Sequence, residues 1–389
     1  MPVRARPVSA IRNDLTLERA AIEVIADSGW DAASMLAVSS RAGLTYGAVY
    51  SRFDDRSAWG VRLWESALLP ALQSVLSGVL QASAGTPDEF EAAMSRCASP
   101  SPTVLAAVEV LLASRFDPVM RGPIESAVGT WLGRACLSRS DVSAQQAVVA
   151  AAGCYLAFGL VLASRRPGIE GLRLSEEFAR YHRAFGSPAE PRALPKDRAR
   201  HLEIAPFNTG DERIDRVFNA AVRVIGEVGY HRATTARICR ASGVSAGFLY
   251  KRYSSKLDLA IAATDAMLAA GFEANAAFTE RLTRKHGVAI AEAVTWRELQ
   301  RPELQVKRAL DLETNRLAMF DVGMRAVRQR TETEFIASLP ADRHQGALRA
   351  FVHTEIAMGL GVHAVANLVP RVWKLPFNVV TEPLLGLTG

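Results

Sequence analysis

The sequence predicts an all-α protein built from two copies of one helical plan. Apolar residues recur at helical spacing along much of the chain, and no alternating apolar and polar run is long enough to indicate a sheet. The stretch from Gly229 to Lys256 has the pattern of two helices joined by a tight turn that contains glycine. A related stretch lies about 200 residues earlier, which indicates an internal repeat.

The later stretch predicts its own local structure. Thr234 to Ser242 is a short amphipathic segment, Gly243-Val244 makes the turn, and Ser245 is placed to cap a second helix over Ala246 to Tyr253. At 1.5 Å per residue this helix is roughly 12 Å long, short enough to lie across a DNA major groove.

The two faces of this short helix differ in character. Leu249 and Tyr253, four residues apart, join Val244 on an inward face. The outward face carries Ala246, Gly247, Tyr250 and Lys251.

The same stretch is basic. It contains no Asp or Glu, and its cations are Arg232, Arg237, Arg240, Lys251, Arg252 and Lys256. Phosphate oxygens favour such a surface, and the release of DNA counterions makes binding strong and salt-dependent. The alternative is a solvated basic face on an ordinary three-helix unit, because helix-turn-helix shapes also occur in proteins that do not bind DNA.

Many positions of this region match one known pattern in order. They are Ala220-Ala221, Gly229-Tyr230, Thr234-Thr235, Ile238, Ala241, Gly243-Val244-Ser245, Gly247, Leu249-Tyr250, Tyr253, Ser255-Lys256 and Leu259. With the preceding helix, Ile214 to Val228, the region resembles the DNA-binding domain of the TetR family of transcriptional regulators. The helical remainder of the chain is compatible with this resemblance but does not carry it.

The first part of the chain repeats the pattern without a gap when Tyr50 is placed over Tyr250. Identical residues then fall at Ala20, Ala21, Val24, Ile25, Gly29, Ala33, Gly43, Gly47, Tyr50 and Arg52. The same register returns later at Ala157/Ala357, Gly159/Gly359 and Leu160/Leu360, a match short enough to arise by chance in apolar helix. The chain therefore resembles two TetR-like subunits fused head to tail.

This organisation predicts five segments. They are a first helix-turn-helix domain (1–60), a first helical regulatory domain (61–186), a linker (187–210), a second helix-turn-helix domain (211–260) and a second helical regulatory domain (261–389). The linker is rich in proline and charge, so much of it is expected to be extended.

In the first half, residues 1–13 are expected to form a flexible arm. Helices are predicted over Leu15–Ser28, Ser34–Ala42 and Tyr46–Phe53, and a longer helix from near Asp55 toward Leu80. Several more helices follow up to Phe185. Their breaks are expected at Ser99 to Pro102, Pro118, Gly122-Pro123 and Pro167-Gly168.

The second half follows the same plan. After the helix-turn-helix, a long helix is predicted from about Lys256, then helices over Val288–Leu299, Pro302–Leu339 (in one or two pieces) and His344–Leu368. Three prolines, Pro370, Pro376 and Pro383, predict an irregular C-terminus without a last packing helix.

Composition fits a packed regulator. The 389 residues are enough for two or more domains, and the formal net charge of +6 suits nucleic acid without requiring it. The four cysteines are scattered without a CxxC pair, which argues against a zinc site or a disulfide framework and favours a reducing cytoplasm. The N-terminus lacks the apolar core of a signal peptide. We predict a cytoplasmic protein without a cofactor.

One segment could instead indicate a membrane protein. Ala147 to Ser164 is uncharged and apolar, near the minimum length for a membrane span, and Arg165 and Arg166 follow it. The alternative is a helix buried by protein on nearly all sides, which its many small residues permit. No second run of this kind is expected, so we predict no membrane partner.

The resemblance implies where DNA would bind. In TetR-like domains the third helix enters the major groove, and a Tyr on it and the basic residue that opens the fourth helix hold phosphates. The residues with implied phosphate roles are Tyr250, Lys256, Tyr50 and Arg56, together with Thr234 and Thr235 at the start of the second helix. The implied base-reading residues are Ser245, Ala246, Gly247 and Lys251 in one half, and Thr45, Tyr46, Gly47 and Ser51 in the other.

The two halves differ in ways that matter for an operator. At matching positions of the two base-reading faces, the second half has Lys251 and Ala246 where the first half has Ser51 and Tyr46. Because the two faces differ, the chain should prefer an asymmetric operator to a palindrome. Acidic residues Asp31, Asp54 and Asp55 offset the cations of the first domain, although one of the last two is placed to cap the fourth helix. We predict that the second domain binds DNA more strongly.

In TetR-like proteins the remaining helices form an effector pocket and a dimer face. Residues 147–163 and 354–368 are the candidates for that face, and their pairing inside one chain would make a pseudo-dimer; association of two chains stays open. The pocket candidates implied by the resemblance are Phe116, Trp131, Tyr155, Phe158, Trp296, Met319, Phe320, Phe351 and His353. An apolar or aromatic effector would suit them. Such residues at helical spacing also form ordinary core.

Enzyme functions find little support. His353-Thr354-Glu355 and His201-Leu202-Glu203 share the H-x-E of deaminases, but no P-C-x-x-C follows either. There is no GxSxG elbow, P-loop or HExxH. We predict a ligand-responsive, sequence-specific transcriptional regulator, more consistent with a repressor than an activator. The alternative is a helical scaffold or effector-binding protein whose DNA-binding modules are degenerate.

Overall fold

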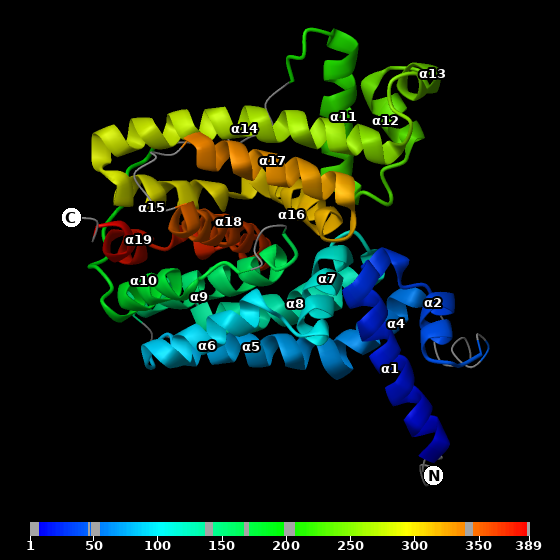
Figure 1. The fold of residues 1–389 in the computed structure, drawn as a ribbon, viewed down its shortest axis with the longest axis horizontal. Coiled ribbons are helices and arrows are strands. Elements are labelled where there is room, and N and C mark those ends of the chain that lie inside the picture. Colours follow the sequence, from blue (N-terminus) through cyan, green and yellow to red (C-terminus); the bar gives the residue numbers. More distant parts are fainter. Residues whose placement is uncertain are drawn as a thin grey trace. The chain divides into compact units, whose positions relative to one another are not determined.

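The computed structural model describes residues 8–45, 47, 55–136, 143–166, 171–197, 207–338 and 345–386 (Figure 1). Every regular element within these ranges is helical, which confirms the all-α fold class. The chain divides into two compact units, which we describe separately. The first comprises residues 1–75 and 100–128, and the second comprises residues 76–99 and 129–389. The five-segment division above stays a prediction.

The first unit holds the first helix-turn-helix region. Its elements are α1 (Val8–Ser28), η1 (Trp30–Ala32), α2 (Met35–Arg41), α4 (Arg56–Leu63), η2 (Trp64–Leu68), the start of α5 (Leu69–Ala82), α7 (Pro102–Ser114) and the first part of α8 (Pro118–Cys136). η2 is a π-turn that joins α4 to α5 in one longer helix. α1 packs against α7 and α2, so the domain's first helix is held from both sides.

Two expectations for this unit are wrong. α1 begins at Val8, so residues 8–13 are helical and do not belong to a flexible arm; residues 1–7 lie outside the described part. α8 runs through Pro123 without a break. Proline removes one hydrogen bond to the carbonyl four residues earlier. That carbonyl belongs to Val119, which is 50% exposed at the start of the helix, so water can satisfy it.

The second unit holds most of the helices. They are α6 (Pro87–Ala98), α9 (Ala144–Ala163), α10 (Ser175–Gly186), α11 (Glu212–Val228), α12 (Thr235–Ser242), α13 (Ala246–Tyr250), α14 (Lys256–His286), α15 (Val288–Leu299), η4 (Pro302–Leu304), α16 (Gln305–Phe320), α17 (Val322–Ser338), α18 (Gln345–Leu368), η5 (Val372–Lys374) and α19 (Asn378–Leu385). The predicted helix over Val288–Leu299 is confirmed at both ends. α14 packs along α15 and α17, as Figure 1 shows.

α9 and α18 form the central helix pair of this unit (Figure 1). A Cβ added to Gly159 of α9 would overlap the carbonyl oxygen of Ala357, and a Cβ added to Gly361 of α18 would overlap the carbonyl oxygen of Tyr155. Glycine therefore permits a close approach of the two backbones at two points.

These two contacts are images of one another. Gly361 lies 202 residues after Gly159, and Ala357 lies 202 residues after Tyr155. Each helix presents to the other the same pair of positions, which is the property of a two-fold interface. The short sequence match of Gly159 with Gly359 is not the register of this contact, because a Cβ on Gly359 meets nothing within 4 Å.

The apolar character of α9 is explained by burial. Within the described residues, two helices are long and apolar enough to cross a membrane: α9, whose apolar window is 83% buried inside the protein, and the helix Arg56–Ala82, whose window is 33% buried. α6 and α7 would make a third only as one broken span. The expectation that no second run of this kind occurs is therefore wrong.

The C-terminal prediction is also wrong, because α19 forms and buries Val379, Val380 and Leu384. Pro383 lies inside it and cannot donate to the carbonyl of Val379. That carbonyl instead accepts the N–H of Ala189 in the linker at 2.9 Å. Thr381 Oγ1 also donates to the Ala289 carbonyl at 2.7 Å. A hydrogen bond from a distant part of the chain thus replaces the helical hydrogen bond that Pro383 cannot make.

Candidate nucleic-acid interface

The second helix-turn-helix is fixed by side-chain caps. Thr234 accepts the N–H of Arg237 at 3.2 Å to start α12, and Ser245 accepts the N–H of Phe248 at 3.2 Å to start α13. Gly243 ends α12 with a positive φ of 69°. The predicted cap at Ser245 is confirmed. The predicted helix is too long, because α13 ends at Tyr250 and not at Tyr253.

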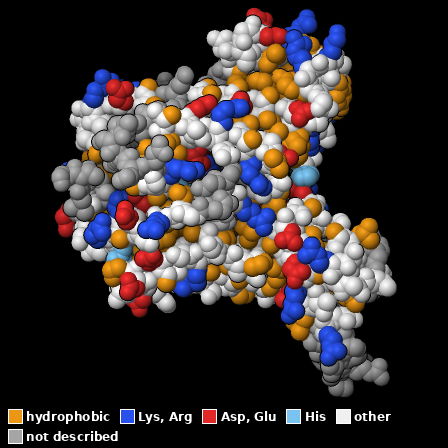
Figure 2. Space-filling model, in the orientation of Figure 1, with side chains coloured by type: hydrophobic (Ala, Val, Ile, Leu, Met, Phe, Trp, Pro, Cys, Tyr) orange, Lys and Arg blue, Asp and Glu red, His pale blue; other side chains and the backbone are white. Residues whose placement is uncertain are grey.

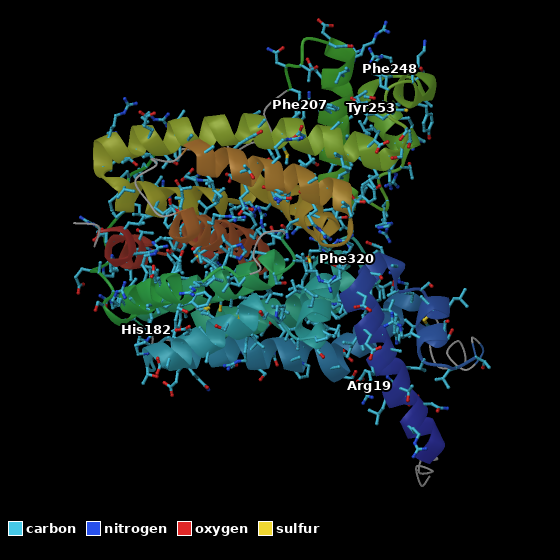
Figure 3. The ribbon with its side chains drawn as sticks, in the orientation of Figure 1. Arg19, His182, Phe207, Phe248, Tyr253 and Phe320 are labelled. Atoms are coloured by element: carbon cyan, nitrogen blue, oxygen red, sulfur yellow. The ribbon has the colours of Figure 1, made fainter. Side chains whose placement is uncertain are left out.

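The two faces of α13 are separated as predicted. Leu249 is buried in the core with Val217 and Ile238, and Tyr253 packs at its edge. The ring of Tyr253 lies 6.2 Å from the ring of Phe218 in α11, so Tyr253 packs against the first helix of the domain (Figure 3). The outward residues are all exposed: Ser245, Ala246, Gly247, Tyr250 (60%) and Lys251.

Glycine on the outward face is not required by packing within the protein. A Cβ on Gly247 would meet only the hydroxyl of Ser245, at 4.0 Å, and a Cβ on Gly47 would meet nothing within 4 Å. Glycine costs about 1 kcal/mol in a helix relative to alanine. Tight packing on the first helix therefore does not explain the glycine at 247, and among the described residues nothing packs against position 47 either.

Basic side chains gather over α11 and α13 in Figure 2. Arg237, Arg240 and Lys251 are exposed, and none of the three makes an ion pair with a described residue. Arg252 is different: it pairs with Asp211 at 3.2 Å and lies 4.3 Å over the Phe248 ring. The positive charge of Arg252 is therefore partly neutralised within the domain.

Lys256, with an implied phosphate role, lies at the junction between the first two helices of the domain. Its Nζ donates to the carbonyl of Tyr230 at 2.8 Å and lies 4.0 Å from the centre of the Tyr230 ring. Gly229, with φ 77°, turns the chain just before that tyrosine. The cation thus holds the loop that precedes Thr234, and its side chain stays partly exposed.

The first domain repeats this junction. Arg56 donates to the carbonyl of Trp30 and lies 4.5 Å over the Trp30 ring, and Gly29 has φ 84°. The Trp30 ring also stacks on Trp59 at 6.0 Å. The implied phosphate residue of each half therefore occupies the same structural position.

A buried carboxylate completes the junction in both halves. Glu109 of α7 accepts the N–H of Trp30 at 2.9 Å, and Glu313 of α16 accepts the N–H of Tyr230 at 2.7 Å. Glu313 also pairs with buried Arg316 at 2.7 Å. The prediction missed both carboxylates. The available signal was a lone Glu109 inside the apolar helix 102–114, since a buried charge needs a specific partner.

The DNA-facing part of the first domain is described only in part. Ser34 caps α2 by accepting the N–H of Ala37 at 3.1 Å. Thr45 and Gly47 are exposed. The candidates Tyr46, Tyr50 and Ser51 lie outside the described residues.

Charges in this domain offset one another. Arg41 of α2 pairs with Asp27 at 3.3 Å and with Glu23 at 3.4 Å. Asp55 caps α4 by accepting the N–H of Ala58 at 2.8 Å, so of the two neighbouring aspartates it is the one that caps the helix.

Most of the predicted effector residues pack against neighbouring side chains in the described part of the chain. Tyr155 packs against the rings of Trp296 and Phe377, 6.4 Å and 6.3 Å away, and its hydroxyl donates to Gln300 at 2.7 Å. This is well-packed core between α9, α15 and α19. Of the other candidates, Phe158 is buried, Phe351 and Phe320 lie beneath Arg180 and Arg165, Trp131 and Phe116 are half-buried, and Met319 lines a small pocket at the end of α16.

His353 is a buried imidazole. It is 1% exposed, and its Nδ1 has no hydrogen-bond partner among the described residues. Burial and the positive charge of Arg166 lower its pKa, Glu332 acts against both, and the net result is a pKa of about 4 against the usual 6.5. The ring is therefore neutral at neutral pH.

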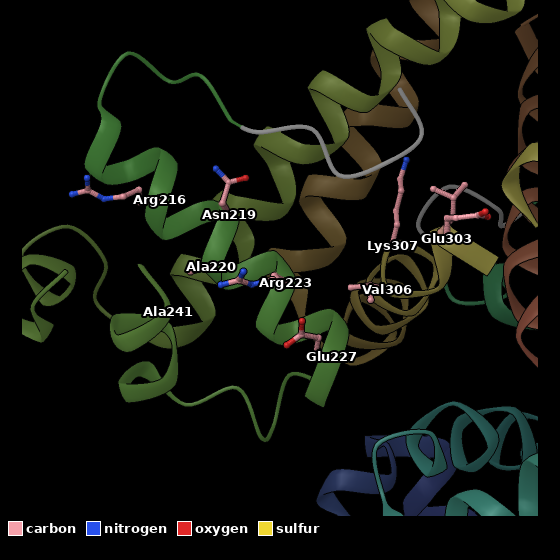
Figure 4. A pocket seen from close by; sticks show the side chains of 10 residues that line it. Arg216, Asn219, Ala220, Arg223, Glu227, Ala241, Glu303, Val306 and Lys307 are labelled. Carbon is pink, nitrogen blue, oxygen red and sulfur yellow. The ribbon is translucent and has the colours of Figure 1, made fainter. Parts of the chain in front are cut away.

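The described part of the chain also has a larger groove, about 700 Å³ in volume, between α11 and α16 (Figure 4). It includes none of the predicted effector residues. Arg216, Arg223 and Lys307 line it together with Glu227 and Glu303, so its charges nearly balance. At Gly226 of α11 a Cβ would lie 2.8 Å from the carbonyl of Val306, so the two helices touch closely beside the groove.

Comparison with known families agrees with this geometry. The family described as "Bacterial regulatory proteins, tetR family" matches residues 18–58 and again residues 217–263, which are the two helix-turn-helix regions. No curated protein matches the chain. The chain thus carries two matches to the TetR family model in tandem, one at each helix-turn-helix region.

Proposed function

We propose that one chain of this protein does the work of a TetR-family dimer. Its two halves would supply two unlike DNA-binding domains to one asymmetric operator and would act in the cytoplasm as a repressor. The observation that carries this proposal is the pairing of α9 with α18. These helices include residues 147–163 and 354–368, which the resemblance assigns to the dimer face.

The glycine contacts support this pairing as a pseudo-dimer interface. Gly159 on Ala357 and Gly361 on Tyr155 are equivalent contacts made by the two halves. An interface between two identical subunits has the same property, because each residue pair occurs twice. A fused pair can change one copy without the other, which a homodimer cannot do.

The chemistry of the two recognition surfaces supports an asymmetric operator. Lys251 is exposed beside α13, and the first half has Ser51 at the matching position. Arginine and lysine bind guanine edges or phosphates, whereas serine binds either base type weakly. Two different surfaces select two different half-sites.

The charge of the second domain supports a larger share of the binding free energy there. Residues 211–260 contain nine Lys and Arg against five Asp and Glu, whereas residues 11–60 contain five against seven. Each phosphate contact by a cation adds to affinity through counterion release. We therefore assign the salt-dependent part of binding mainly to the second domain.

An apolar effector would regulate this binding. The family's general organisation is the support for such a ligand, because Tyr155 and Trp296 pack as core. A ligand changes DNA affinity only by its different affinity for two arrangements of the DNA-binding domains. Addition of candidate hydrophobic compounds to a preformed complex would test this, with release of DNA as the expected result.

The second candidate function is a helical scaffold with degenerate DNA-binding modules. The observation in its favour is the first domain, where Arg41 is paired with two carboxylates and acidic residues outnumber basic ones. A gel-shift experiment on DNA upstream of the neighbouring genes separates the two functions. The regulator binds that DNA with a salt-dependent affinity, and the scaffold binds it no better than it binds unrelated DNA.

A further inference from the structure

A small pocket in the second unit is lined by arginines from both halves of the chain. Arg165 and Arg166 come from the end of α9, and Arg325 and Arg328 come from α17. No Asp or Glu lines it. Its volume is about 10 Å³, which is room for a single water-sized particle.

The hydrogen bonds of these arginines leave some donors unused. Arg325 donates to the carbonyls of Ala318 and Met319 at 3.0 and 2.9 Å, which satisfies the end of α16. Arg166 is 9% exposed and uses Nη2 to pair with Glu332 at 2.6 Å. Arg328 uses Nη2 to donate to the carbonyl of Asp311 at 2.9 Å and to Thr314.

Two N–H groups at this pocket are buried without an acceptor. The Nε atoms of Arg166 and Arg328 have no hydrogen-bond partner among the described residues. A buried donor without an acceptor costs about 1–3 kcal/mol, and more when it is charged. Native proteins rarely leave such groups unsatisfied, so an acceptor is expected near them.

Electrostatics favours an anion as that acceptor. Burial is the main cause that lowers the pKa of Arg328 to about 10; the nearby charge of Arg166 acts in the same direction, and Asp311 acts in the opposite one. Two guanidinium groups that repel each other in a dry site are both stabilised by a negative charge between them. A water molecule would satisfy a donor but would leave the repulsion.

We propose that this pocket is a binding site for one small monatomic anion, a halide, held by the Nε–H groups of Arg166 and Arg328. The anion would join the end of α9 in the first half to α17 in the second half. It would therefore stabilise the contact between the two halves. This site does not depend on DNA binding.

Thermal unfolding of the full chain at constant ionic strength tests the proposal. Sodium gluconate, whose anion is too large for the pocket, is replaced stepwise by sodium chloride, and in a separate series by sodium bromide. A ligand that binds only the folded state stabilises it in a saturable manner. We expect the Tm to rise by several degrees and then to level off in at least one series, and that series identifies the anion.

Two variants separate specific binding from bulk salt effects. Arg328→Met removes one Nε–H, and Arg330→Met removes an exposed arginine of the same helix that pairs with Asp265. We expect the saturable rise to persist in Arg330→Met and to vanish in Arg328→Met. An equal rise in both variants, or no rise with any anion in the wild type, overturns the proposal.

A crystallographic measurement covers the case in which Arg328→Met does not fold. Crystals of the wild-type chain grown in bromide should show an anomalous peak between Arg166 and Arg328. A peak that appears only at molar bromide, with no change of Tm below about 0.1 M, means an adventitious ion only and rejects the site.

Discussion

The junctions of the two helix-turn-helix domains are built from the same hydrogen bonds, but the surfaces around them differ. In both domains a glycine with positive φ is followed by an aromatic residue whose N–H binds a buried glutamate and whose carbonyl binds a cation. Near this junction, the first domain has Ala37 and Ser40 at the positions that correspond in sequence to Arg237 and Arg240 of the second domain. The shared part maintains the fold, and the divergent part is the part that would contact DNA.

A similar contrast separates the interface from the domains it joins. Gly159 and Gly361 preserve a symmetric helix contact. The DNA-binding surfaces attached to each half have diverged in charge. The helix interface is constrained by the close approach of two backbones, which only glycine permits at these positions. The exposed surfaces have no such packing constraint, so their charges can differ between the two halves.

The largest expected effect concerns the symmetric interface. Gly159→Leu or Gly361→Leu forces a side chain into a backbone carbonyl, so the two helices must separate. We expect a loss of more than about 5 kcal/mol, which is exceptional for one substitution and removes most of the stability of an ordinary domain.

Gly359→Ala is the matched control for these substitutions. Its Cβ meets nothing, and alanine in a helix interior is better than glycine by about 0.5–1 kcal/mol. Urea unfolding monitored by circular dichroism measures both effects. A stable Gly159→Leu variant would show that the symmetric contact is not needed.

The next effect tests the shared junction. Glu313→Ala removes the acceptor of the Tyr230 N–H and the partner of buried Arg316. We expect a loss of about 3–5 kcal/mol in the free energy of unfolding. Glu109→Ala should also destabilise, by about 1–3 kcal/mol, because the Trp30 N–H loses its acceptor. Exposed Glu303 provides the control, and Glu303→Ala should change stability by less than about 0.5 kcal/mol.

A third prediction tests the difference in charge. Arg237→Ala with Arg240→Ala should weaken DNA binding about 10-fold or more at moderate salt and should reduce the salt slope by up to about 2. Arg41→Ala, which removes a cation already paired with Glu23 and Asp27, should have little effect. Fluorescence anisotropy over a salt series measures both. Equal losses would mean that the second domain has no special electrostatic role.

The same comparison extends to the cations of the two junctions. We expect Lys256→Met to weaken DNA binding more than Arg56→Met does. Both variants also lose a hydrogen bond to a loop carbonyl, so their stability must be measured alongside. If the two variants lose similar free energy of unfolding but Lys256→Met loses more DNA affinity, the second domain makes the stronger phosphate contact.

The smallest effect concerns pH. His353 has no counterpart in the first half, since the residue 202 positions earlier is Ala151. Its pKa is about 4 in the folded chain and near 6.5 in the unfolded chain, so only the unfolded chain gains a proton between these values. The contribution of neutral His353 is complete above pH 6.5 and is lost as pH falls toward 4, by up to ~3 kcal/mol.

Comparison with a His353→Leu variant isolates this contribution. Other shifted groups, such as Glu292, whose pKa burial raises to about 7, are present in both proteins and largely cancel. The difference in unfolding free energy between the two proteins should change between pH 6.5 and 4. A difference that is constant over this range means that His353 is not buried as a neutral ring.

Local signals in the sequence were sufficient for the helix-turn-helix. The cap at Ser245, the turn at Gly243 and the buried position of Leu249 follow from residues within a few positions of one another. The ends of α15 were predictable for the same reason. Features that depend on distant residues were not. α19 survives Pro383 because Ala189, far away in the chain, donates to the carbonyl that the proline leaves without a donor.

The site shows the same limit. The outward face of α13 could be predicted from helical spacing alone. The role of Lys256 at the Tyr230 carbonyl could not, because it depends on the path of the loop after Gly229. The interface register of 202 residues was missed for a similar reason, since sequence identity aligns residues whereas packing aligns the points where two backbones approach.

Footprinting of the purified full chain on DNA from its own locus shows whether one chain can occupy one asymmetric operator. We expect one chain to protect one operator with two unlike half-sites, and the half-site of the second domain to stay protected to higher salt. A palindromic footprint with equal halves, or no retention of duplex DNA even in dilute buffer, would contradict it.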